Sequence, residues 1–163
     1  MKEFKSQQNQ SASATANTSD VPKKNGSKKE LTEVTVFRKD IDLGAEDKYG
    51  HWWTKITPNE SYGWWPKKPV GLSDTLFGTE GELNGVTSFK GTATKDPHHI
   101  DTSGDEYKVI SESGKPETQI QDEMRSFAKS YSGEWRWTFG AGQNCHTFQK
   151  DMLQKSNLKV EKK

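Results

Sequence analysis

Hydrophobic and polar residues alternate over several short runs in the first half of the chain, which is the pattern of strands with one buried face. The first run is EVTVFRKD at 33–40, which is rich in β-branched side chains. Two aromatic runs follow, GHWWTKI at 50–56 and ESYGWWP at 60–66. The three-residue turn TPN between these aromatic runs predicts a β-hairpin.

The next part of the chain is less regular. We expect glycine-rich loops between Gly71 and Gly85. GVTSFKGTAT at 85–94 and DEYKVISES at 105–113 contain β-branched and aromatic residues and are predicted as strands. The spacing of these segments favours strands that are joined by short turns.

The segment PETQIQDEMRSFAKSYSG at 116–133 has the hydrophobic period of a helix. Its apolar side chains fall on one stripe: Ile120, Met124, Phe127, Ala128 and Tyr131. Pro116 suits the first helical turn and Gly133 suits the C-terminal stop.

Three shorter elements complete the prediction. EWRWTF at 134–139 is extended, a second helix spans 145–156, and LKV at 158–160 is a final short strand. The sum is an α+β fold in which a small, mainly antiparallel sheet packs on a few helices.

Composition divides the chain into two parts. Residues 1–33 are mostly Ser, Asn, Gln, Lys and Thr, and cannot bury enough apolar surface to offset the entropy of ordering them. We therefore expect a disordered polar N-terminal tail over 1–33 and one folded domain over 34–163. Hydrophobic residues make up only 29% of the 163 residues, and this tail accounts for much of the deficit.

Charge excludes some classes of partner. The net charge is +1, which gives no electrostatic case for binding nucleic acid. No apolar run approaches the roughly 18 residues of a membrane span, and the start of the chain lacks the apolar core of a secretory signal. We expect a soluble protein, and export would need a system that does not depend on a signal peptide.

The only cysteine lies in QNCHTFQKDML at 143–153, so an internal disulfide is excluded. Asn144 is a good N-cap residue, which would make Cys145 the first residue of the second helix. Unpaired N–H groups and the positive end of the helix dipole favour a thiolate there. Phe148 and Met152 continue the same face and would anchor it on the core. The alternative is that Cys145 is a small buried apolar residue without chemistry.

A nucleophilic thiolate needs an imidazole as proton acceptor. His51 lies on a predicted strand, which would hold its ring rigidly, and is our candidate general base. His98 and His99 lie in the polar loop KDPHHID, where we expect solvated side chains. His146 should point elsewhere on its helix.

Metal chemistry is the rival hypothesis. Zinc could in principle be held by Cys145, His98, His99 and His146, but these residues lack the C-x-x-C or H-x-x-x-H spacing that structural zinc sites show. We expect no metal and no cofactor.

Two segments together resemble a known group of enzymes. HWWTKI…ESYGWWP places a histidine strand before the cysteine helix NCHTF, as in the circularly permuted papain-like enzymes. The chain resembles the PPPDE peptidase family most, where an Asn-Cys-Asn-x-Phe motif opens the nucleophile helix; here His146 stands in the usual Asn position. The lecithin retinol acyltransferase relatives are similar, with a His-Trp strand and an Asn-Cys-x-His-Phe helix. The likeness covers these two motifs and their order.

The resemblance implies a permuted papain-like fold with Cys145 as nucleophile and His51 as general base. No carboxylate or imidazole stands about a dozen positions after His51, where related enzymes carry a residue that orients the ring. Glu60 is too far along the predicted hairpin for a hydrogen bond. We therefore expect a Cys–His dyad, with any orienting group supplied from another part of the chain.

The predicted activity is a cysteine peptidase or amidase that cleaves an amide or isopeptide bond through an acyl-enzyme. The backbone N–H of Cys145, together with Gln143 and Asn144, would meet the oxyanion or position the substrate. The six tryptophans form three pairs, of which Trp53 and Trp64 are candidates for a substrate groove; core packing is the alternative for them.

Substrate classes that fit this activity are a peptide, a protein or a peptidoglycan-like polymer. The organisation also resembles C-terminal toxin modules of bacterial effectors, which would imply a cognate inhibitor protein. A lipid acyltransferase or phospholipase with the same dyad, and a non-catalytic binding module, remain as alternatives.

Overall fold

The computed structural model describes residues 28–41, 49–138 and 141–162. Along the chain the elements are β1 (Glu30–Ile41), β2 (Tyr49–Thr57), β3 (Glu60–Tyr62), β4 (Trp64–Pro66), α1 (Leu72–Phe77), β5 (Thr79–Leu83), β6 (Asp105–Ser111), α2 (Glu117–Ser130), β7 (Glu134–Trp135), α3 (Cys145–Lys155) and β8 (Leu158–Val160). The predicted α+β class is confirmed, with antiparallel sheets and three helices in the described part of the chain.

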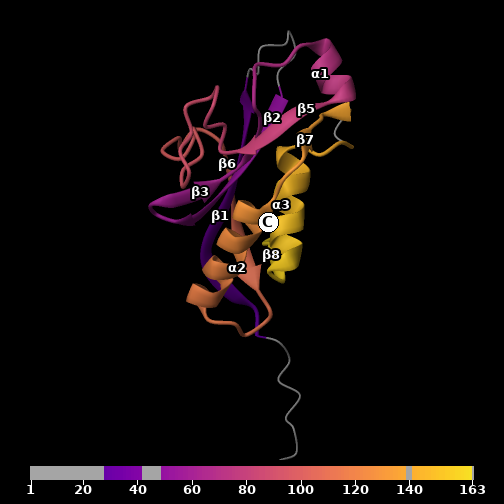
Figure 1. Cartoon of the computed structure of the whole chain (residues 1–163). Coiled ribbons are helices and arrows are strands. Elements are labelled where there is room, and N and C mark those ends of the chain that lie inside the picture. Colours follow the sequence, from indigo (N-terminus) through magenta and orange to yellow (C-terminus); the bar gives the residue numbers. More distant parts are fainter. Residues whose placement is uncertain (1–27, 42–48, 139–140, 163) are drawn as a thin grey trace, which may run out of the picture.

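The strands form two sheets. The larger has the order β3-β2-β1-β6-β8, the smaller has the order β4-β5-β7, and every neighbouring pair is antiparallel. Helices α2 and α3 contact each other, and α3 packs against β2 and β8 of the larger sheet (Figure 1). The smaller sheet and α1 lie at one end of the molecule, beside the first residues of α3.

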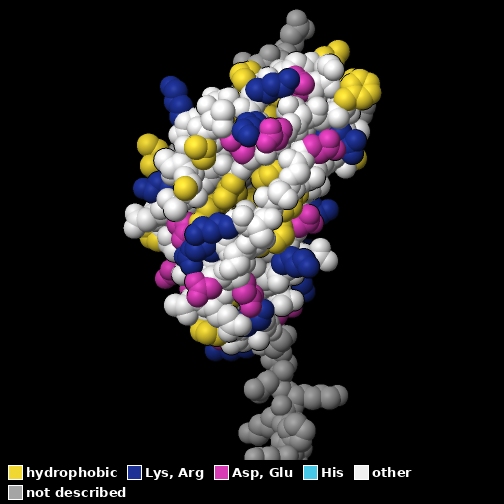
Figure 2. Space-filling model, in the orientation of Figure 1, with side chains coloured by type: hydrophobic (Ala, Val, Ile, Leu, Met, Phe, Trp, Pro, Cys, Tyr) yellow, Lys and Arg dark blue, Asp and Glu magenta, His cyan; other side chains and the backbone are white. Residues whose placement is uncertain are grey.

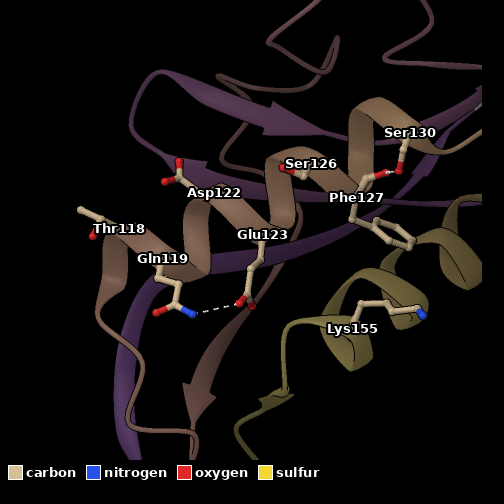
Figure 3. A pocket seen from close by; sticks show the side chains of 8 residues that line it. All are labelled: Thr118, Gln119, Asp122, Glu123, Ser126, Phe127, Ser130 and Lys155. Atoms are coloured by element: carbon tan, nitrogen blue, oxygen red, sulfur yellow. Dashed lines mark hydrogen bonds between the residues drawn. The ribbon is translucent and has the colours of Figure 1, made fainter.

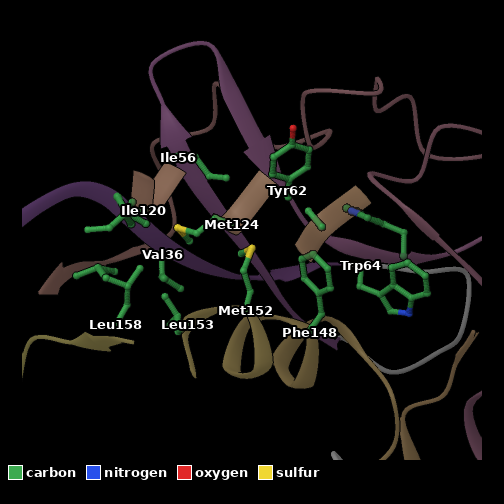
Figure 4. Close-up of a cluster of buried hydrophobic side chains, with 14 of the residues drawn as sticks. Val36, Ile56, Tyr62, Trp64, Ile120, Met124, Phe148, Met152, Leu153 and Leu158 are labelled. Atoms are coloured by element: carbon green, nitrogen blue, oxygen red, sulfur yellow. The ribbon is translucent and has the colours of Figure 1, made fainter. Parts of the chain in front are cut away.

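The core lies between the larger sheet and the helix pair (Figure 4). The predicted stripe of α2 faces it, with Ile120, Met124 and Ala128 buried. From α3, Phe148 and Met152 point into the same cluster. The amphipathic pattern of both helices therefore predicted their buried faces correctly.

The sheet begins earlier than the composition indicated, because β1 starts at Glu30 inside the predicted tail. Glu30 pairs with Ser111 of β6, and the buried hydroxyl of Thr32 donates to the Val109 carbonyl at 2.8 Å. Ladder pairing uses backbone groups, so polar side chains did not prevent it. Residues 1–27 of the predicted tail lie outside the described residues.

The predicted aromatic hairpin is split between the two sheets. Only β3 pairs with β2, through the partners Thr54 and Tyr62, and a bulge follows Lys55. After Gly63 the chain crosses to the smaller sheet, where β4 pairs with β5. The end of β2 that carries His51 therefore lies at the seam between the sheets.

Two predictions for the part of the chain between β4 and β6 were wrong. The expected loops at 71–85 contain α1 and β5, whose six and five residues are too short for a clear hydrophobic period. The expected strand at 85–94 is a series of turns. Positive φ angles at Gly85 (55°) and Lys90 (67°) are incompatible with an extended strand.

Candidate active site

Cys145 is the first residue of α3, as its position after an N-cap residue predicted. The side-chain oxygen of Asn144 accepts hydrogen bonds from the N–H groups of His146 at 2.9 Å and Thr147 at 3.2 Å. Thr147 closes the capping box by accepting from the Asn144 N–H at 2.8 Å. The cap leaves the N–H of Cys145 without an acceptor among the described residues.

The sulfur of Cys145 lies against the start of β2. Its Sγ donates to the Gly50 carbonyl at 3.3 Å, and the side chain is close enough to the ring of His51 to raise the pKa of the imidazole. Cys145 is 5% exposed and His51 is 3% exposed. The two predicted catalytic side chains are therefore adjacent and largely shielded from water.

Asp96 completes this arrangement from a third part of the chain. The Nε2 atom of His51 lies 3.0 Å from Asp96 Oδ2, so Nδ1 is the ring nitrogen that Asp96 does not contact. The carboxylate is 2% exposed and also accepts from Trp65 Nε1 at 2.7 Å and from the N–H of His98 at 2.9 Å. Imidazole and carboxylate are thus in direct contact, and the cysteine lines the same narrow space as the imidazole.

Burial and charge act in opposite directions on this pair. Burial lowers the pKa of His51, but the charge and hydrogen bond of Asp96, with a smaller contribution from Cys145, outweigh it and raise the pKa to about 9. For Asp96, burial raises the pKa, but the charge and hydrogen bond of His51 hold it below its ordinary value. Imidazolium and carboxylate are therefore the stable forms at neutral pH.

Two aromatic rings hold the imidazole in place. Trp65 lies with its ring centroid 4.1 Å from that of His51, and Trp53 stacks on His51 at 5.7 Å. Gly63 makes the close approach of the chain possible. A Cβ atom there would overlap Asp96 Oδ2 and would lie 3.1 Å from His51 Nε2. A glycine before two tryptophans was the local sign that a buried side chain passes close to this strand.

A narrow space of about 10 Å³ adjoins the sulfur and the imidazole. Its walls are largely aromatic: Trp64, Trp65, Pro66, Trp135 and Trp137 line it with Gly50, His51 and Cys145. Trp64 was one of the two predicted groove residues and lies in this wall. Trp53 was the other, but it is fully buried between His51 and Phe37, and the lining does not include it.

The side-chain amides of Gln143 and Asn144 have main-chain partners. Gln143 Nε2 donates to the Ser132 carbonyl at 2.9 Å, and Asn144 Nδ2 donates to the Gly142 carbonyl at 3.0 Å. Asn144 is fully buried and acts as the helix cap. These contacts do not favour the predicted oxyanion role of either amide, and they make the backbone N–H of Cys145 the better candidate.

The other histidines have distinct places. His99 is 7% exposed, so the expectation of a solvated side chain was wrong for it. His98 is half-buried, with its ring centroid 5.6 Å from that of His51. His146 points away from the site, as expected, and stacks on Trp52 at 4.8 Å. Within the described residues, no three histidine, cysteine or acidic side chains are grouped closely enough to hold a metal ion.

A second hollow lies far from this chemistry, between α2 and the end of α3 (Figure 3). Its lining includes Gln119, Glu123, Phe127 and Lys155, and Gln119 donates to Glu123 at 3.2 Å. It is an open surface lined mostly by polar side chains, so we place the candidate site at the buried sulfur instead. Side chains of both charge signs are interspersed on the face that Figure 2 shows.

The chain matches no protein-family model, no curated protein and no solved structure. The likeness to permuted papain-like enzymes therefore rests on the two sequence motifs. In the part of the chain that the structure describes, no helix has the length and apolar character needed to cross a membrane.

Proposed function

We propose that this chain is a cysteine-dependent hydrolase that cleaves an amide or isopeptide bond through an acyl-enzyme. Cys145 is the nucleophile, His51 transfers the proton, and Asp96 orients the ring. One observation carries the proposal: the imidazole of His51 lies between a buried carboxylate 3.0 Å away and the only cysteine, which stands at a helix start. Nucleophilic cysteine enzymes use a cysteine and a histidine in this order, and a third group can orient the ring.

The attacking form in this mechanism is a thiolate beside the His51 imidazolium, so the thiol must first lose the proton that it donates to the Gly50 carbonyl. The charge of Asp96 keeps the ring of His51 protonated at neutral pH. The thiolate attacks the carbonyl carbon, and the Cys145 N–H donates to the oxyanion. The C–N bond then breaks as the imidazolium protonates the leaving amine. Water attacks the thioester and gives a proton to the neutral imidazole. The C–S bond breaks, the carboxylic acid leaves, and thiolate and imidazolium are restored.

The cavity indicates the kind of group that reaches the sulfur. No charged side chain other than His51 lines it, and its walls are mainly indole rings. A space of about 10 Å³ holds no more than about one water molecule, so an uncharged segment of a peptide, a protein or a peptidoglycan-like polymer would reach the sulfur only after the indole walls move apart. The toxin or effector role, with a cognate inhibitor protein as partner, belongs to the same proposal and has only the organisation of the chain as support.

The aromatic walls also favour a second candidate function. The rings of Trp64, Trp135 and Trp137 offer an apolar surface to an acyl chain if they move apart, so a lipid acyltransferase or phospholipase with the same three groups is the alternative. Peptide and phospholipid substrates, each assayed with wild type and Cys145→Ser, distinguish the two functions.

The proposal is tested through the thiol itself, since a single cysteine makes alkylation specific. We expect iodoacetamide to modify Cys145 rapidly near pH 6 to 7, where a free thiol of pKa about 8.5 reacts slowly. His51→Ala should slow this reaction at least tenfold. Slow alkylation in wild type, with no effect of the substitution, would show that the sulfur is inert and would leave a non-catalytic binding module.

A further inference from the structure

Asp96 needs support from other parts of the chain to keep its position. It lies in the irregular segment between β5 and β6, where the turns at 85–94 take the place of a strand. A sheet ladder therefore does not hold this segment. Its side chain must nevertheless remain within 3.0 Å of His51 Nε2, so other groups must fix the backbone around it.

Ser61 on β3 supplies several of these contacts. Its N–H donates to the Thr94 carbonyl at 2.9 Å, and its Oγ accepts from the N–H of Asp96 at 3.0 Å. Ser61 is fully buried, and its backbone pairs with Lys55 of β2, the strand that carries His51. One residue thus connects the strand of the imidazole to the backbone of the carboxylate.

His99 contacts the hydroxyl of Ser61 from the other side, and we call Ser61 and His99 together the clamp. Its Nε2 lies 2.9 Å from the Pro58 carbonyl, which can only accept, so Nε2 carries the hydrogen. Its Nδ1, 2.8 Å from Ser61 Oγ, is then free to accept the hydroxyl proton. Burial lowers the pKa of His99, which fits this neutral form. The hydroxyl of Ser61 is thereby directed toward His99, and a lone pair is left for the N–H of Asp96.

We propose that Ser61 and His99 are positioning residues that hold Asp96 against His51. They touch neither the sulfur nor the cavity, and they act only through the backbone of Asp96. Loss of either contact lets the segment move, and the carboxylate then spends less time within hydrogen-bond distance of the imidazole. The importance of this clamp for catalysis rests on the proposed function, whereas its effect on His51 does not.

The test uses Ser61→Ala and His99→Gln in the full chain, with Ser111→Ala as the matched control. Ser111 is also a buried serine, but its Oγ bonds to Ser113 at 2.9 Å, and it pairs with Glu30 at the opposite end of β1 from His51. Each variant is compared with wild type in three measurements. These are NMR titration of the His51 ring, the rate of Cys145 alkylation at pH 7, and the thermal unfolding temperature.

We expect Ser61→Ala to lower the pKa of His51 by about one unit or more, because an opposite charge within hydrogen-bond reach is typically worth one to three units. His99→Gln should give a smaller shift in the same direction, since its amide can still donate to the Pro58 carbonyl. Alkylation should slow in the same order. Ser111→Ala should leave both measurements at their wild-type values.

Lower unfolding temperatures with an unchanged titration of His51 would overturn the proposal, because they would show that the contacts only stabilise the loop. If Ser61→Ala does not fold, the titration of His99→Gln decides alone, and an unshifted His51 again overturns it. An inert Cys145 in wild type would refute the hydrolase but not this clamp, because the titration requires no activity.

Discussion

Replacing Asp96 by Asn tests the electrostatics of the site most directly. The substitution keeps the shape of the side chain and removes the charge that faces His51. Three donors converge on the carboxylate: His51 Nε2, Trp65 Nε1 and the N–H of His98. An amide has only one acceptor oxygen, so its NH₂ group must face one of these donors, and at least one hydrogen bond is lost.

The magnitude follows from the pKa of His51. Its rise from 6.5 to about 9 corresponds to about 3 kcal/mol of stability, at about 1.4 kcal/mol per pKa unit. The folded-state pKa is raised, so this stability is fully present below pH 6.5 and is lost as the pH rises to about 9. Asp96 has a lowered pKa, so its own contribution is present above its ordinary value of 3.8 and is lost only as the pH falls further.

In Asp96→Asn, burial is left as the main influence on His51, and its pKa should fall below 6.5. Wild type should therefore lose about 3 kcal/mol of unfolding free energy between pH 6 and pH 9.5 that the variant does not lose. Even at pH 9.5 the variant should stay about 1 to 3 kcal/mol less stable, because a buried donor has no partner. Urea unfolding at several pH values measures both differences.

NMR titration of the His51 ring, assigned with His51→Gln, provides the direct check. Asp101→Asn is the matched control, because Asp101 lies 3.5 Å from His98 Nδ1 and bonds to Lys39 but is not in the hydrogen-bond series of the site. It should leave the titration of His51 unchanged. The reasoning fails if His51 titrates near 6.5 in wild type, or if the stability profiles of wild type and Asp96→Asn run parallel.

Three further predictions concern the surroundings of the site. Gly63→Ala should lower the free energy of unfolding by about 1 to 3 kcal/mol and remove most of the thiol reactivity, because the new methyl overlaps the orienting carboxylate. The control is Gly71→Ala, whose Cβ would meet nothing closer than 3.9 Å and which should cost under about 1 kcal/mol in the same urea unfolding assay. Asn144→Ala should remove the cap of α3, lower the free energy of unfolding by about 0.5 to 2 kcal/mol and slow alkylation, and a thermal melt that matches wild type would contradict the capping role. Gln149→Leu should lower the free energy of unfolding in urea by about 1 to 3 kcal/mol, because buried polar groups of β2 and β3 lose the partners that this amide provides. Gln154→Leu, on the exposed side of α3, should be close to neutral in the same assay.

Local patterns in the sequence were sufficient for α2 and α3, though not for the short α1, and for two groups of the site. The apolar stripe of α2 reflects a period of 3.6 residues, and the capping box at Asn144 involves residues only three apart. The start of α3, and with it the place of Cys145, follows from that cap. His51 was identified because it lies on a strand of clear alternation.

The hairpin shows where local patterns stop being informative. The run at 60–66 has the composition of one strand, yet β3 and β4 belong to different sheets. Which partner a strand pairs with depends on the whole set of neighbours, because β-propensity describes a half-buried surface and not a particular partner. The absent strand at 85–94 has the same cause.

The local sequence alone therefore determined the buried faces of α2 and α3, the cap of α3, and the candidates for nucleophile and base. Each of these depends on residues within a few positions of one another. Only the tertiary structure decided that Asp96, 45 residues from His51, supplies the carboxylate. That contact depends on the path of an irregular segment, which is held in place by hydrogen bonds to the N–H and to the side-chain hydroxyl of Ser61. No periodicity or spacing encodes such a path, since it results from the packing of the chain as a whole.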